Sequence, residues 1–243
     1  MKHQILALET SGTTGSVAAL VGEQLLGQRV LAGPMRTAQS LAPAVRDLLD
    51  DIGWRPRDVR LIAVAGGPGS FTGLRIGVTT AKTLAYVTGS DLLGVNTLEV
   101  IADQAPAEVP RLWALLGAQR GELFVGEFQR PAGQAMRWSQ ETRLVAAEAW
   151  LSQLPTDTYV SGPALSRLDQ RLTAHLRRVE ASRQAPMAEG VGRLAARLYA
   201  AGRRSDVWSL VPQYFRRSAA EEKWLQRHEA QKPDGCSPEE PGG

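Results

Sequence analysis

Residues 61–86, LIAVAGGPGSFTGLRIGVTTAKTLAY, constrain the fold more than any other part of the chain. They begin with five apolar residues in a row, which is typical of a strand buried on both faces of a sheet. Three glycines and a proline follow within four positions, so the backbone there needs positive φ values or a close approach to another group. From Leu74 onward apolar residues recur at helical spacing. The stretch therefore predicts a strand, a tight turn and a helix in succession.

Small residues occupy one side of that predicted helix. Gly77 and Ala81 are four positions apart, so they share a face and leave it nearly bare. The distance between packed helices depends on the side chains at the contact, and a bare face allows a close approach. We therefore expect another helix to pack against this face.

The residues before and after this stretch predict the rest of a first lobe. Residues 4–10, 16–21 and 24–31 are apolar runs separated by polar turns, so we expect three successive antiparallel strands. Leu41, Val45 and Leu48 begin a helical pattern that ends at Gly53, which predicts an amphipathic helix of about four turns. A short strand at 91–95 and a short helix at 98–104 complete the order βββαβαβα.

Pro106 and Pro110 mark the expected boundary between two lobes. The first lobe is predicted to span residues 1–105 and the second residues 106–227, with the last helices able to pack back on the first lobe. In the second lobe, strands are expected at 111–118, 122–129, 136–144 and 159–161, and helices at 146–154, 165–172 and 186–201. Residues 228–243, rich in Pro, Gly and Glu, predict a disordered tail. Two successive meander-then-helix units indicate a duplicated topology.

The composition narrows the class of protein. Hydrophobic residues make up 43% and charged residues 22% of the chain, as in folded globular domains. The longest apolar runs last about five residues, far short of the roughly 20 that span a bilayer, so we expect no contact with a membrane. The single cysteine, Cys236, excludes an internal disulfide, and the three histidines show no ligand spacing. We expect a cytoplasmic protein without a metal or cofactor, and a net charge of +3 does not by itself predict nucleic-acid binding.

The glycine-rich loop at residues 66–73 admits two interpretations. Backbone amides at the start of a helix can cradle a phosphate. A P-loop, however, has Lys and then Ser or Thr after its last glycine, where this chain has Leu74 and Arg75. A dinucleotide fingerprint needs G-x-G-x-x-G, and the loop reads G-x-G-x-x-x-G. These mismatches favour a structural turn and leave a phosphate site as the alternative.

A second polar turn follows the first predicted strand. It contains Thr10, Ser11, Gly12 and Thr13, directly after Glu9. Hydroxyls and amides in such a turn can hold the phosphates of a metal-bound nucleotide, and the same residue types are favoured in ordinary turns for local hydrogen bonding. The pattern alone weights the two interpretations equally.

Two runs of sequence carry a family resemblance. ILALETSGTTGSVA at residues 5–18 and AVAGGPGSFTGLRIGVTTAKTLAY at residues 63–86 closely resemble the bacterial TsaB (YeaZ) family, and GPGSFTGLRIG is the most specific part. The resemblance continues to the P-x-Y-F-R element at residues 212–216, so it covers nearly the whole chain apart from the tail. It implies an α/β protein with a two-lobed actin-like, sugar-kinase-like (ASKHA, RNase H-like) fold, in which each lobe is a mixed β-sheet with helices.

The resemblance also implies a function in forming N6-threonylcarbamoyladenosine in tRNA. Members of this family look like catalytically silent paralogues of the TsaD-type transferase that pair with it, while a TsaE-type ATPase joins a larger complex and association with tRNA is indirect. Pairing uses two first-lobe helices, here residues 36–52 and 73–88, against the equivalent helices of the transferase or of a second copy in a homodimer. The residues expected at this interface are Leu41, Val45, Leu48, Phe71, Leu74, Arg75, Gly77, Val78 and Ala81.

Departures from the family pattern bear on catalysis. Transferases of the TsaD type carry two histidines four residues apart that bind a metal, and the histidines here are His3, His175 and His228. Thr37 stands where the family often has another histidine. We therefore expect no catalytic residues and a scaffold role. Two alternatives are a stand-alone actin-like ATPase or kinase that binds a magnesium nucleotide through Glu9 and the turn after it, and a metallopeptidase, which the missing histidines disfavour.

Overall fold

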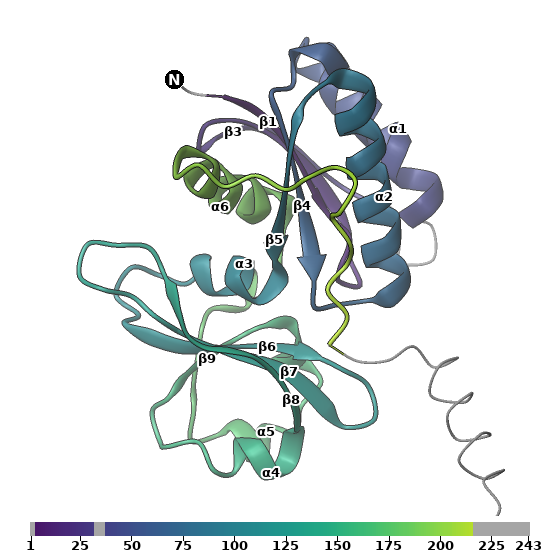
Figure 1. Cartoon of the computed structure of the whole chain (residues 1–243). Coiled ribbons are helices and arrows are strands. Elements are labelled where there is room, and N and C mark those ends of the chain that lie inside the picture. The colour runs from purple at the N-terminus through teal and green to yellow at the C-terminus, as the bar shows by residue number, and fades with distance from the viewer. Residues whose placement is uncertain (1–2, 32–36, 216–243) are drawn as a thin grey trace, which may run out of the picture.

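The computed structural model of the chain describes residues 3–31 and 37–215. They form two five-stranded sheets with helices on their faces, one sheet in each lobe (Figure 1). Three parts of the sequence analysis lie outside the described residues: Arg36 at the start of the first predicted interface helix, residues 216–227 at the end of the predicted second lobe, and the tail at 228–243.

The first sheet has the strand order β3-β2-β1-β4-β5. Strands β1, β2 and β3 form the antiparallel meander, and β4 and β5 run parallel to β1. All five predicted strands are present, and their ends differ from prediction by at most two residues. Their bounds are β1 Gln4–Glu9, β2 Ser16–Val21, β3 Gln24–Val30, β4 Leu61–Gly67 and β5 Asp91–Asn96.

The second sheet repeats this arrangement with the order β8-β7-β6-β9-β10. Strands β6, β7 and β8 are an antiparallel meander, and β9 and β10 run parallel to β6. The predicted duplication of topology is confirmed. The bounds are β6 Arg111–Gly117, β7 Glu122–Gln129, β8 Arg137–Ala146, β9 Tyr159–Ser161 and β10 Arg177–Arg178.

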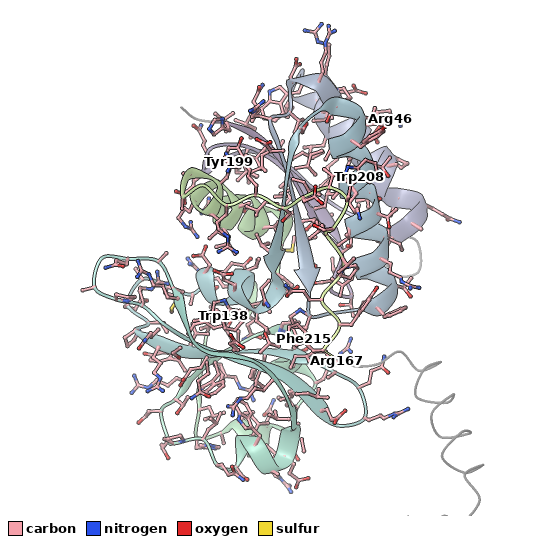
Figure 2. The ribbon with its side chains drawn as sticks, in the orientation of Figure 1. Arg46, Trp138, Arg167, Tyr199, Trp208 and Phe215 are labelled. Atoms are coloured by element: carbon pink, nitrogen blue, oxygen red, sulfur yellow. The ribbon has the colours of Figure 1, made fainter. Side chains whose placement is uncertain are left out.

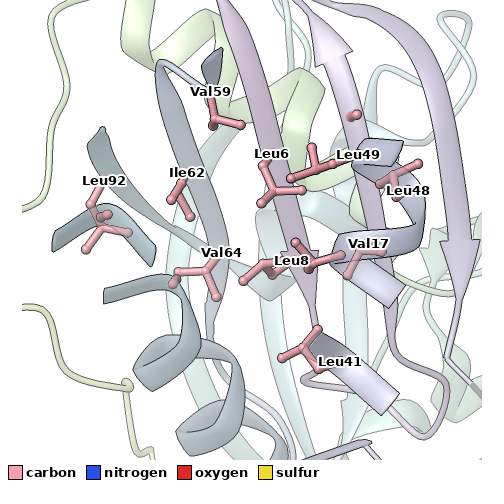
Figure 3. Close-up of a cluster of buried hydrophobic side chains, with 14 of the residues drawn as sticks. Leu6, Leu8, Val17, Leu41, Leu48, Leu49, Val59, Ile62, Val64 and Leu92 are labelled. Carbon is pink, nitrogen blue, oxygen red and sulfur yellow. The ribbon is translucent and has the colours of Figure 1, made fainter. Parts of the chain in front are cut away.

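Three helices cover the two faces of the first sheet. Helices α1 (Thr37–Asp51) and α2 (Phe71–Thr88) lie on one face, and α6 (Ala188–Ala200) packs on the other, against β1 and β2. Successive side chains of a strand point to opposite faces, so Leu6 of β1 packs beneath α1 and α2 while Ile5 packs beneath α6. The cluster under α1 and α2 is drawn in Figure 3. Burial on both faces explains why β1 and β4 read as continuous apolar runs.

The remaining helices are short. Helix α3 (Thr97–Asp103) lies between the sheets and buries Leu98 and Ile101 against the second one. Helix α4 (Ala147–Leu151) follows β8. The prediction of one helix at 165–172 is wrong. A 3-10 turn spans Pro163–Ser166, and the separate helix α5 (Gln170–Thr173) begins after Asp169. Asp169 caps α5 by accepting a hydrogen bond from Arg171 N. Further 3-10 turns are Pro56–Asp58 and Ala181–Arg183.

Residues 203–215, which we call the C-terminal strap, leave α6 and run along α2 toward the second lobe (Figure 1). Lys82 of α2 donates hydrogen bonds to the carbonyl oxygens of Trp208 and Leu210, at 3.1 and 3.0 Å. Farther along, Gln213 N donates to Gly66 O at 2.7 Å. Phe215 lies between the lobes in Figure 2, and its ring is 6.2 Å from that of Phe124 in β7. The strap therefore joins α2, the glycine-rich loop and the second sheet.

The close packing of α2 on the sheet generates a stability prediction. A Cβ atom at Gly77 would collide with Thr10 Oγ1, so Gly77→Val should lower the free energy of unfolding by about 1–3 kcal/mol. Thr79→Val, on the exposed side of the same helix, should change it by less than about 0.5 kcal/mol. Urea unfolding of the two variants measures the difference, and equal stabilities would contradict the assigned orientation of α2.

Candidate functional site

Seven of the nine residues expected at a partner interface are buried in the core of this chain. They pack in the core between the first sheet and its two long helices, and Val45, which is 6% exposed, also lines the groove described below. The residues buried in this way are Leu41, Val45, Leu48, Leu74, Gly77, Val78 and Ala81, and their part in a partner interface stays a prediction. Phe71 is half-buried and Arg75 is exposed, so these two remain predicted interface residues.

The bare face of α2 is covered by the chain's own first sheet. Gly73 and Gly77 lie against Thr10 at the end of β1, and Thr10 Oγ1 donates a hydrogen bond to Gly73 O at 2.8 Å. Because neither glycine has a Cβ atom, the helix approaches the strand end closely. The small residues thus serve a contact between a helix and a strand of one chain.

The surface available to a partner is the outer face of α1 and α2. It consists of the exposed side chains on both helices: Ala38, Gln39, Ala42, Pro43, Arg46, Asp50, Asp51, Thr72, Arg75, Thr79, Thr83, Tyr86 and Val87. An apolar groove of about 250 Å³ lies between the helices, and its lining includes Ala42, Val45, Leu49, Leu84 and the sheet residue Leu6. Tyr86 and Val87, 67% and 75% exposed, extend this apolar surface along α2.

Aromatic contacts fix the strap to the beginning of α2. The rings of Phe71 and Tyr214 are 4.7 Å apart, and Arg75 lies 4.4 Å from the centre of the Phe71 ring. Arg75 Nε also donates a hydrogen bond to Tyr214 Oη at 3.2 Å. At the other end of α2, Tyr86 packs edge-on against Trp208 at 5.5 Å, and Figure 2 shows Trp208 beside the helix. The strap borders the outer face along most of α2.

Several backbone amides around the glycine-rich loop already have hydrogen-bond partners within the chain. Ser70 N donates to Ser11 O at 2.8 Å, and Leu74 N donates to Ser70 O at 2.8 Å. Ser70 is the N-cap of α2, because its side-chain oxygen accepts a hydrogen bond from Gly73 N. The amides of Ser70, Gly73 and Leu74 are therefore used within the chain, which favours the structural turn over the phosphate cradle. A serine directly before a helical pattern is a recognised N-cap signal, so the capping role of Ser70 could have been predicted from the sequence.

The candidate nucleotide site is the turn after β1, and the side chain of Glu9, directly before that turn, occupies hydrogen-bond donors of the turn. Glu9 Oε1 accepts hydrogen bonds from Ser11 N and Ser11 Oγ, both at 2.6 Å, and from Gly12 N at 3.2 Å. Ser11 is buried and Gly12 is half-buried. Thr10 is buried too and bonds to α2, so Thr13 is the one exposed residue among the four predicted to bind a nucleotide. The geometry supports the structural interpretation of this turn.

Glu9 itself is fully buried. Burial raises the pKa of its carboxyl group from 4.5 to about 7, and the hydrogen bonds from Ser11 and Gly12 offset part of that rise. Its second oxygen, Oε2, has no hydrogen-bond partner within the described structure. A carboxyl group in this position cannot reach a metal or nucleotide in solvent without a rearrangement of the turn.

Within 3–31 and 37–215, no three His, Cys, Asp or Glu side chains are placed to hold a metal ion. Of the helices described, none is both long and apolar enough to cross a bilayer.

The raised pKa of Glu9 predicts a dependence of stability on pH. The folded chain retains this proton up to about pH 7, whereas the unfolded chain releases it near pH 4.5, so the burial of Glu9 becomes destabilising as the pH rises through that interval. Glu9→Gln keeps an acceptor oxygen and carries no charge. From pH 5 to pH 8, the wild type should lose about 2–3 kcal/mol of unfolding free energy relative to Glu9→Gln.

Urea unfolding at the two pH values measures this difference, with Glu108→Gln as the control for loss of an exposed carboxylate. A difference between wild type and Glu9→Gln that is the same at pH 5 and pH 8 would contradict the raised pKa.

Comparisons with known proteins agree with the fold and the sequence motifs. A family model described as TsaD, tRNA N6-adenosine threonylcarbamoyltransferase, matches residues 36–224. The tRNA threonylcarbamoyladenosine biosynthesis protein TsaB of Bacillus subtilis is 30% identical over 233 residues, which cover 91% of this chain and 98% of that protein. TsaB of Escherichia coli is 34% identical over 129 residues, which cover 52% of this chain and 55% of the relative.

A solved structure extends the likeness to three dimensions. YeaZ from Pseudomonas aeruginosa superposes with a TM-score of 0.72 at 30% identity, and the match covers 87% of this chain and 99% of that one. The expected α/β fold, with a mixed β-sheet and helices in each lobe, is confirmed. With sequence and structure alike over nearly their whole length, the chain belongs to the TsaB (YeaZ) family of tRNA threonylcarbamoyladenosine biosynthesis proteins.

Proposed function

We propose that this chain is a non-catalytic partner subunit in the formation of N6-threonylcarbamoyladenosine in tRNA, and that it binds and activates a TsaD-type transferase in the cytoplasm. The observation that carries the proposal is the outer face of α1 and α2, with its apolar groove between the helices. Family membership supplies the pathway, because the relatives are named for this biosynthesis.

The outer face has the properties of a helix-docking surface. Along α2 it carries the short side chains of Thr72, Thr79 and Thr83, which let a partner helix approach closely. The groove beside them offers an apolar pocket to a side chain of the partner, and filled pockets near an interface centre contribute most of the binding energy. Tyr86 and Val87 add exposed apolar area of the kind that marks interaction sites.

The match to the transferase family model supports a heterodimer. The model covers residues 36–224, which include α1 and α2, so a transferase of that family carries equivalent helices. Two related helix pairs can meet face to face about an approximate twofold axis, as identical patches do in symmetric dimers. A second copy of this chain competes for the same face. A TsaE-type ATPase would join the larger complex, and tRNA would be reached through the transferase.

The closed turn after β1 argues against a stand-alone ATPase or kinase. Its donors at Ser11 and Gly12 already bond to Glu9, so a nucleotide phosphate would have to displace a buried carboxyl group. The partner role requires no such rearrangement, because it uses an exposed surface.

Filling the groove should weaken binding to the transferase. Ala42→Trp places a large side chain at the groove lining, and we expect at least a tenfold higher Kd, since about 1.4 kcal/mol of interface energy corresponds to that factor. Calorimetric titration of the transferase with the variant measures the change. Ala149→Trp, an equivalent substitution at an exposed helical position of the second lobe, is the matched control and should bind like the wild type.

Two results would count against the proposal. Equal affinity of the Ala42→Trp and Ala149→Trp variants would move the interface away from α1 and α2. Tight magnesium-ATP binding with turnover by the isolated chain would favour the ATPase alternative.

A further inference from the structure

Large apolar side chains are exposed mainly along one strip of the molecule. Of the nine that residues 3–31 and 37–215 expose, six lie at the end of α2 or on the C-terminal strap: Tyr86, Val87, Trp208, Val211, Tyr214 and Phe215. Single exposed apolar residues are ordinary, whereas apolar surface concentrated in one place marks an interaction site. The strap is therefore a candidate binding surface.

Trp208 is held by residues 206–210, which we call the Trp208 turn. Its side chain is 74% exposed, although its backbone is fixed from two sides. Within the turn, Asp206 Oδ2 accepts hydrogen bonds from Trp208 N at 3.1 Å and from Ser209 N at 2.7 Å. From α2, Lys82 donates to the carbonyl oxygen of Trp208. The fold thus presents an indole ring to solvent on a rigid support, beside α2 (Figure 2).

Trp208 has the properties of a binding anchor. A side chain on a fixed backbone loses little conformational freedom when a partner covers it, so more of the interaction energy appears as affinity. Tryptophan and tyrosine are also among the residues that contribute most to protein interfaces. The helices offer few such residues, because Ala42, Thr79 and Thr83 on their outer face are small. The strap places Trp208 beside Tyr86 at the end of α2.

We propose that the Trp208 turn is the second part of the transferase-binding surface, and that the bound transferase covers the strap and the outer face of α1 and α2 together. The inference rests on the proposed function and adds a binding element outside the two helices. Tyr86 connects the two parts. It follows Thr79 and Thr83 on one face of α2, and its ring packs 5.5 Å from that of Trp208, so the two surfaces are continuous.

The extent of the helix face favours the same occupant. Helix α1 has seven exposed side chains and α2 has six, whereas a standard interface takes about 20–30 residues from each partner. A subunit bound to the helices therefore needs neighbouring surface to form a stable complex. The strap runs along α2 and supplies that surface, with exposed aromatic residues on it (Figure 1).

The experiment titrates a TsaD-type transferase with full-length variants in a calorimeter. For Trp208→Ala we expect at least a tenfold higher Kd, because loss of an anchor residue costs that much or more. Trp208→Phe keeps an aromatic ring and should retain most of the affinity. The control is Leu26→Ala, an exposed apolar position of β3 at the opposite edge of the first sheet from β5, which should bind like the wild type.

Folding is checked on the same samples. Because the Trp208 side chain is exposed, the Tm of Trp208→Ala should lie within about 2 °C of the wild type. In the wild type, hydroxyl-radical labelling of Trp208 should fall several-fold when the transferase is bound. Unchanged labelling in the complex would refute the proposal without any substitution.

A double-mutant cycle tests whether the rigid support matters. Lys82→Met removes the hydrogen bonds that α2 donates to the Trp208 turn, so it should weaken binding several-fold in the wild type and have little effect in Trp208→Ala. Equal effects in both backgrounds would contradict the claim that Lys82 acts by positioning Trp208.

Three results separate this inference from the proposed function. If Ala42→Trp weakens binding and Trp208→Ala does not, the strap is outside the interface and the proposed function stands. If neither variant weakens binding, both fail. If Trp208→Ala abolishes self-association of this chain and leaves its affinity for the transferase unchanged, the strap serves a second copy and the inference is overturned.

Discussion

The contact between the end of β1 and the beginning of α2 sets the geometry of the first lobe. Thr10 donates to a carbonyl of the first turn of α2, and Ser70, the N-cap of that helix, donates back to Ser11. The contact exists because Gly73 and Gly77 lack the Cβ atoms that would block it. With α2 fixed at this distance, the groove against α1 and the exposed row of threonines follow.

The same contact has an electrostatic consequence. The turn after β1 packs against α2, and Glu9 beside it is buried. Burial of a carboxylate is unfavourable unless hydrogen bonds offset the lost hydration. The amides of Ser11 and Gly12 offset part of the loss, and protonation near neutral pH removes the rest. The donors of Ser11 and Gly12 that satisfy the buried carboxyl group are then taken, so a phosphate would have to displace Glu9 to reach them.

The strands were predictable from the sequence, whereas the element that packs against the small-residue face of α2 was not. Strands β1 and β4 are apolar on both faces, and that pattern specifies a central strand whatever surrounds it. Gly77 and Ala81 specify only that something approaches closely. A partner helix and the chain's own sheet require the same spacing, so burial of this face inside the lobe needed the structure. The single helix predicted at 165–172 does not form, because Asp169 within that segment caps a new helix, α5.

The two lobes differ in their helices far more than in their sheets, and this difference localises the proposed interface. In the first lobe, α2, with 18 residues, lies between the parallel strands β4 and β5. In the second lobe, α5, with 4 residues, lies between the parallel strands β9 and β10. After the meander, α1 has 15 residues and its counterpart α4 has 5. Helix-on-helix packing needs several turns on each side to bury a useful area. Among the described residues, α1 and α2 are the pair of neighbouring helices that meets this requirement with an exposed face, because α6 is committed to the sheet.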